Sequence, residues 1–175
     1  MQQPPLLPEE TLARVLRAAR FNGMSVMLIS GLFALISAGT KDHIGAVAGL
    51  VVAGAGAMET HGGAILAQGY FRGMRWLVWS QLVCLGGILV YCAVRLSLGT
   101  APPLPEDLRP AIAADAAQLG MTAEELILRS YHLGLYLIAT LSVIYQGGMA
   151  IYYSRRQAAV GQALETDVDE AYVGE

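Results

Sequence analysis

Glu59 is the one formally charged residue inside a long apolar stretch, and it is the first candidate for chemistry in this chain. The stretch runs from Ile44 to Phe71 and lies between Asp42 and Arg72. Such a run predicts a membrane-crossing helix, in which a charged, unpaired carboxylate near the middle costs several kcal/mol. The cost is avoided if the carboxyl group is neutral, paired or in contact with water. Glu59 is therefore either a hydrogen-bond partner between helices or a titrating proton or cation site.

Other polar side chains are expected to meet Glu59 inside a helix bundle. At 100° per residue, His61 lies about 200° around the helix from Glu59, so the two side chains cannot share one ligand. Buried polar atoms need partners that lipid cannot supply. The predicted intramembrane polar site comprises Glu59, His61, Gln81, Tyr145 and Gln146. Serines at a similar depth can join it: Ser25, Ser30, Ser80 and Ser142.

Four glycines form a face along the same predicted helix. Gly45, Gly49, Gly56 and Gly63 fall within about 40° of one another on a helical projection. A glycine face lets a neighbouring backbone approach closely, which is how membrane helices gain packing contact. We therefore expect residues 44–67 to form the central helix, with its glycine face against another helix, a partner protein or a second copy of the chain.

A second cluster of reactive side chains is predicted at the opposite end of the bundle. His43 and His132, with Arg95, Tyr91 and Tyr131 at the same level, are candidates for binding a haem iron or a metal ion. The sequence has no Cys-x-x-Cys-His attachment motif. Neither a nucleophile–base pair nor a required cofactor can be named, so an enzyme is not predicted.

The two cysteines are interpreted as buried apolar residues. Cys84 and Cys92 lie on one predicted helix, about 12 Å apart along its axis. That separation is too large for a disulfide bond.

Composition and segment lengths predict an all-α integral membrane protein. The chain is 55% hydrophobic and only 14% charged, against about 25% charged in soluble domains. The expected order is a surface helix, four transmembrane helices, an outer cap after the third of them, and a tail. Their ranges are 8–20 for the amphipathic surface helix, 21–40, 44–67, 76–98 and 130–154 for the transmembrane helices, 100–129 for the Pro-rich and helical cap, and 155–175 for the tail.

The placement of basic residues predicts the orientation. Seven of the eleven Lys and Arg residues fall on the side of the termini if the chain crosses four times. Basic residues favour the cytoplasmic side, so both termini are predicted to be cytoplasmic in a bacterial inner membrane. The sequence has no basic patch with interleaved aromatic residues, so nucleic-acid binding is not expected.

These patterns indicate no characterised family, and they leave three functions open. The favoured one is a small, non-enzymatic accessory or structural subunit of the inner membrane. The first alternative is a proton- or cation-coupled carrier or sensor that uses Glu59. The second is a b-type haem or metal-binding membrane protein that uses His43 and His132.

Overall fold

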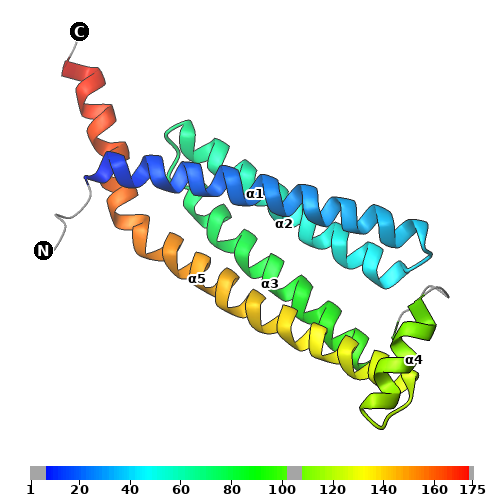
Figure 1. The fold of residues 1–175 in the computed structure, drawn as a ribbon. Coiled ribbons are helices and arrows are strands. Elements are labelled where there is room, and N and C mark those ends of the chain that lie inside the picture. Colours follow the sequence, from blue (N-terminus) through cyan, green and yellow to red (C-terminus); the bar gives the residue numbers. More distant parts are fainter. Residues whose placement is uncertain (1–6, 102–107, 174–175) are drawn as a thin grey trace, which may run out of the picture.

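The described part of the chain folds into five helices, four of which are long and apolar enough to cross a membrane. The computed structural model describes residues 7–101 and 108–173, with side chains described as far as Glu165; this part contains no strand. The helices, in chain order, are α1 Pro8–Gly39, α2 His43–Ala67, α3 Gly73–Leu98, α4 Arg109–Gln118 and α5 Ala123–Val173 (Figure 1). The all-helical class and the four long apolar helices were predicted from the sequence and are confirmed.

α1 is longer than predicted because the expected surface helix 8–20 and the segment 21–40 form one continuous helix. No Pro or Gly interrupts residues 9–22, so nothing in the sequence ends the helix at residue 20. Apolar side chains of its first turns pack inside the protein and do not face a membrane surface, since Val15 and Ala19 are both fully buried. The prediction of a separate helix at residues 8–20 was therefore wrong, because the helix does not end at residue 20.

α5 also exceeds its prediction, since it continues through the segment 155–175 that was predicted to be a tail. Val160 and Ala163 are buried on this extension, and Tyr153 is buried just before it. The extension and the first turns of α1 share one core cluster with the α2–α3 turn. Its buried members are Val15, Ala19, Leu66, Met74, Leu77, Tyr153 and Val160.

The connections between helices follow local backbone chemistry. Asp42 caps the N-terminus of α2, where its side chain accepts a hydrogen bond of 3.0 Å from the Gly45 N–H. Thr122 and Glu125 form a capping box at the start of α5: each backbone N–H donates to the other's side chain, at 3.0 and 3.2 Å. The Pro-rich part of the predicted cap, residues 102–107, lies outside the described residues, and α4 packs on α5.

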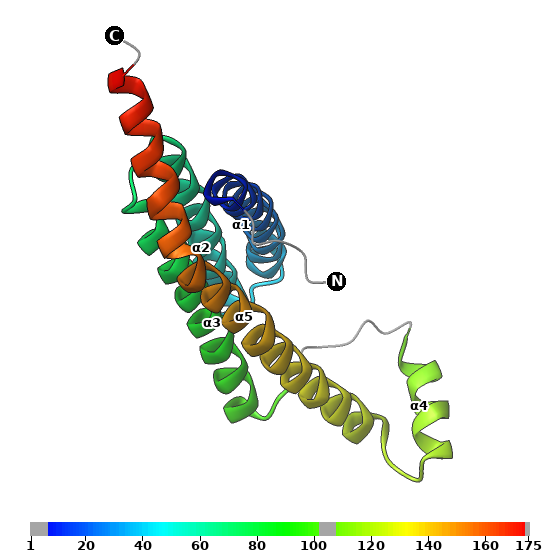
Figure 2. The same ribbon diagram turned by 90° about the vertical axis from the view of Figure 1, so that its left-hand side faces the viewer.

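The four long helices form two antiparallel hairpins, α1–α2 and α3–α5. The start of α1 and the end of α5 lie at one end of the bundle, here called the terminal end, and α4 lies at the other (Figures 1 and 2). The hairpins are close together at the terminal end and diverge toward α4 (Figure 1). The terminal end therefore holds the main core, and the other end is more open.

Candidate functional site

The Glu59 carboxyl group is enclosed by donors from two other helices. Its side chain is buried, with 2% of the residue exposed. Its Oε2 atom accepts a hydrogen bond of 2.7 Å from the Asn22 amide of α1. Its Oε1 atom accepts a hydrogen bond of 2.6 Å from the Tyr153 hydroxyl of α5. One carboxyl group on α2 thus connects three helices.

The network continues from Asn22 to the surface of the bundle. The Tyr145 hydroxyl donates to Asn22 Oδ1 at 2.8 Å. The Asn22 amide therefore uses its donor and its acceptor at the same time. Tyr145 is 52% exposed, so this residue is the outermost member of the chain of hydrogen bonds.

α3 contributes Gln81, which is 1% exposed and lies next to the Glu59 carboxyl group. Its Nε2 atom donates to the Ser80 hydroxyl at 3.3 Å, and Ser80 in turn donates to the Leu77 carbonyl at 2.8 Å. The Oε1 atom of Gln81 is buried without a hydrogen-bond partner. Polar side chains from all four long helices thus gather around Glu59, in the half of the bundle near the termini.

Of the other predicted polar residues, Gln146 lies in the interior and His61 does not. The Gln146 amide donates to the Cys84 sulfur at 3.3 Å. His61 is exposed on the other side of α2, where its ring stacks edge-on against Trp76 with centroids 5.5 Å apart. This placement agrees with the helical projection, which separated His61 from Glu59. Cys84 and Cys92 are both buried free thiols.

Sequence reasoning missed Asn22 and Tyr153, the two direct partners of Glu59. Asn22 is the only asparagine in the chain and lies near the start of an apolar stretch. It lies on the same face as Thr11, Val15 and Ala19, and all four are buried. That spacing of 4, 4 and 3 residues was the available signal, and it requires α1 to be continuous.

The glycine face of α2 lies against α1 of the same chain. A Cβ atom added at Gly56 would lie 2.6 Å from the Met27 backbone nitrogen, and one at Gly49 would lie 2.9 Å from the Ala34 nitrogen. At Gly45 an added Cβ would collide with Asp42 and Ser37. Gly63 is less crowded. A partner or second copy could reach the three crowded glycines only by displacing α1.

The outer candidates, His43 and His132, lie in different surroundings. His43 is exposed at the first position of α2, whereas the His132 Nε2 atom is buried without a hydrogen-bond partner. Arg95 forms an ion pair with Asp42, and its guanidinium lies over the Tyr91 ring at 5.4 Å from the centroid. Among the described residues, no group of three or more His, Cys, Asp and Glu side chains could hold a metal ion.

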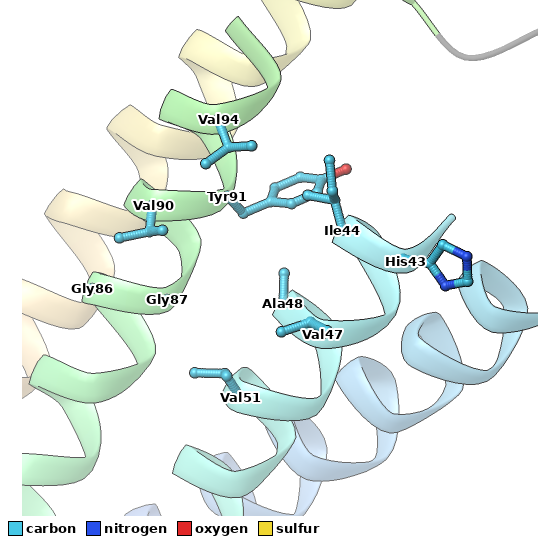
Figure 3. A pocket seen from close by; sticks show the side chains of 10 residues that line it. All are labelled: His43, Ile44, Val47, Ala48, Val51, Gly86, Gly87, Val90, Tyr91 and Val94. Atoms are coloured by element: carbon cyan, nitrogen blue, oxygen red, sulfur yellow. The ribbon is translucent and has the colours of Figure 1, made fainter. Parts of the chain in front are cut away.

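Two apolar cavities lie between the hairpins, at the end away from the termini. The α2–α3 cavity has a volume of about 640 Å³ and is bordered by Val47, Val51 and Val90, among others (Figure 3). The second cavity opens between Ile29 of α1 and Ile138 of α5 and is called the α1–α5 cavity. It has a volume of about 590 Å³. Ala48 and Tyr91 border both cavities, and Glu59 borders neither.

Comparison with protein-family models, curated proteins and solved structures finds no match to this chain. The hydrogen-bonded network of Glu59, Asn22, Tyr153 and Tyr145 can hold the helices in a fixed arrangement or respond to the protonation of Glu59. The two apolar cavities can hold an apolar molecule.

Proposed function

We propose that the chain is a polytopic inner-membrane protein that crosses the bilayer four times, with both termini in the cytoplasm. Four long apolar helices support the crossings. Large apolar side chains such as Leu28, Leu50 and Leu141 are more than half exposed along them, which suits contact with lipid. The arginines near the terminal end support the orientation. They are Arg14, Arg17, Arg20, Arg72, Arg75, Arg155 and Arg156.

Within the membrane, the proposed role is that of a non-enzymatic accessory or structural subunit. The observation that carries this proposal is the enclosure of Glu59, the one formally charged side chain in its apolar stretch. Both carboxyl oxygens accept hydrogen bonds, from Asn22 and Tyr153, and neither apolar cavity reaches the group. A carboxyl group used in this way fixes the mutual position of helices.

Infrared spectroscopy of the carboxyl band tests this role. The purified protein in lipid vesicles is compared with Glu59→Gln in pH-difference spectra between about pH 5 and 9. The structural role predicts that no band assigned to Glu59 changes over this range. A band that titrates in the wild type and is lost in Glu59→Gln would contradict it.

A proton- or cation-coupled carrier or sensor is the second candidate, and one observation favours it. The hydrogen bonds from Glu59 through Asn22 to Tyr145 connect a buried carboxyl group with an exposed side chain. Such a chain can signal the protonation of Glu59 to the surface: if the carboxyl group is protonated, the Asn22 amide can turn over, accept from the carboxyl O–H and donate to the Tyr145 oxygen. The titrating band described above would move this candidate ahead of the structural one.

The accessory role also predicts a stable protein partner. Extraction from native membranes with a mild detergent should retain that partner through two purification steps. Purification of the chain alone, in a folded and monodisperse form at native expression level, would argue against an accessory role.

A further inference from the structure

The α1–α5 cavity is a lateral pocket with a buried floor and an exposed rim. Residues from all four long helices line it. Val52 of α2 and Leu135 of α5 lie on its floor, with 8% and 3% of each residue exposed. Ile29 of α1 and Ile138 of α5 lie on its rim, with 69% and 49% exposed. The pocket therefore opens sideways, through the surface that the proposed membrane location places against lipid.

We propose that the α1–α5 cavity binds one acyl chain of a membrane phospholipid. This inference rests on the membrane location proposed above. The walls are almost wholly apolar, so water and ions are poor occupants. Its volume of about 590 Å³ lies within the range of ligand pockets.

The pocket opens through the surface that faces lipid, and lipid acyl chains are the hydrocarbon that a bilayer supplies at this opening. A flexible hydrocarbon chain can follow a narrow apolar pocket down to its buried floor. A helix of a partner protein seated on this face would keep lipid away from the floor residues Val52 and Leu135, which is one of the outcomes that the test below distinguishes.

Polar side chains place the lipid head group at the end near α4. Ser130 and Tyr131 border the cavity at the start of the proposed crossing by α5. Arg129 precedes them and is exposed, so it can meet a phosphate group. From there the acyl chain runs toward Val52, with Leu135 and Ile138 along its side.

Photo-crosslinking with a lipid probe tests the proposal. The full chain is reconstituted in phosphatidylcholine vesicles that contain a phosphatidylcholine with a diazirine near the middle of one acyl chain. After irradiation, peptide mapping locates the labelled residues. We expect labelling of the buried floor residues Val52 and Leu135, in addition to outward-facing residues such as Leu141.

A cavity-filling substitution and a matched control sharpen the test. Gly134 borders the cavity, and a Cβ atom added there meets nothing within 4 Å, so the leucine of Gly134→Leu starts in open space and adds its bulk to the cavity wall. Gly147 on the same helix is equally uncrowded and does not border this cavity. Gly134→Leu should lose labelling of Val52 and Leu135 and keep labelling of Leu141. Gly147→Leu should keep all three.

The outcomes separate this inference from the proposed membrane location. Labelling of Leu141 without labelling of Val52 and Leu135 in the wild type would overturn the lipid site and leave the membrane location intact. The lipid site would also be overturned if Gly134→Leu left the floor labelling unchanged. Absence of labelling at every residue, Leu141 included, would overturn the membrane location and the lipid site together.

Discussion

The Tyr153 hydroxyl is the atom whose removal best tests the Glu59 network. Tyr153→Phe keeps the fully buried ring and deletes only the donor that lies 2.6 Å from Glu59 Oε1. Hydrogen bonds between membrane helices contribute about 0.6 kcal/mol on average and up to about 1.7 kcal/mol. A buried acceptor left without a partner costs about 1–3 kcal/mol. We therefore expect Tyr153→Phe to lower the free energy of unfolding by about 1–2 kcal/mol.

The neighbouring tyrosine provides the control. Tyr152 is partly buried, and Arg156 lies over its ring, so Tyr152→Phe deletes a hydroxyl that does not bond to Glu59. Unfolding is measured by circular dichroism during titration of detergent-solubilised protein with sodium dodecyl sulfate. Tyr153→Phe should be clearly less stable than Tyr152→Phe. Equal free energies of unfolding for the two variants would refute the claim that this hydrogen bond holds α5 to α2.

A double-mutant cycle isolates the pair itself. Glu59→Leu removes both acceptor oxygens, so the Tyr153 hydroxyl has no acceptor left at position 59. Combined with Tyr153→Phe, it should show a coupling energy of about 0.5–1.5 kcal/mol, because the two groups share one hydrogen bond. Strict additivity would mean that the two side chains contribute independently and that the network does not act as a unit.

Two further predictions concern helix packing and capping. Gly56→Ala should destabilise the fold by about 1–3 kcal/mol, because the added Cβ meets the α1 backbone at 2.6 Å. Gly54→Ala is the control on the same helix: its added Cβ meets nothing within 4 Å, so the variant should be neutral or stabilised by up to about 1 kcal/mol. If the two variants unfold in detergent with equal free energies, α2 does not pack closely on α1 at Gly56. Asp42→Ala should lower the free energy of unfolding by about 1 kcal/mol more than Asp42→Asn, because Asn can still cap the Gly45 N–H. Equal losses in the same unfolding measurement would show that Asp42 acts through its charge and not as a helix cap.

The helices themselves could be predicted from sequence because long apolar runs and short polar turns identify them directly. Residues 44–67 were predicted as one helix, and α2 spans His43–Ala67. The capping box of Thr122 and Glu125 is likewise a pattern of residue types at a fixed spacing. These features depend on local sequence, and local sequence contains the necessary information.

The partners of Glu59 could not be predicted, because they depend on where the helices of the terminal end meet. Asn22 was hidden by the assumption that the first crossing begins as a separate helix at residue 21, and Tyr153 by its proximity to Arg155 and Arg156. Both residues are buried at the end of the bundle where the α5 extension past residue 154 packs on the first turns of α1. Charge and aromatic residues near a segment end favour an interface, and this tertiary contact overrides that preference.

The two ends of the bundle are stabilised by different means, and this difference bears on function. The terminal end combines the apolar core around Val15 and Tyr153 with the Glu59 network, so its helices are held both by packing and by directed hydrogen bonds. At the other end an ion pair between Arg95 and Asp42 joins the two hairpins, and apolar cavities lie between the hairpins near it. An apolar occupant that enters between the hairpins would meet less resistance there than at the terminal end. A lipid site near α4 is therefore compatible with a fixed arrangement of the helices around Glu59 at the terminal end.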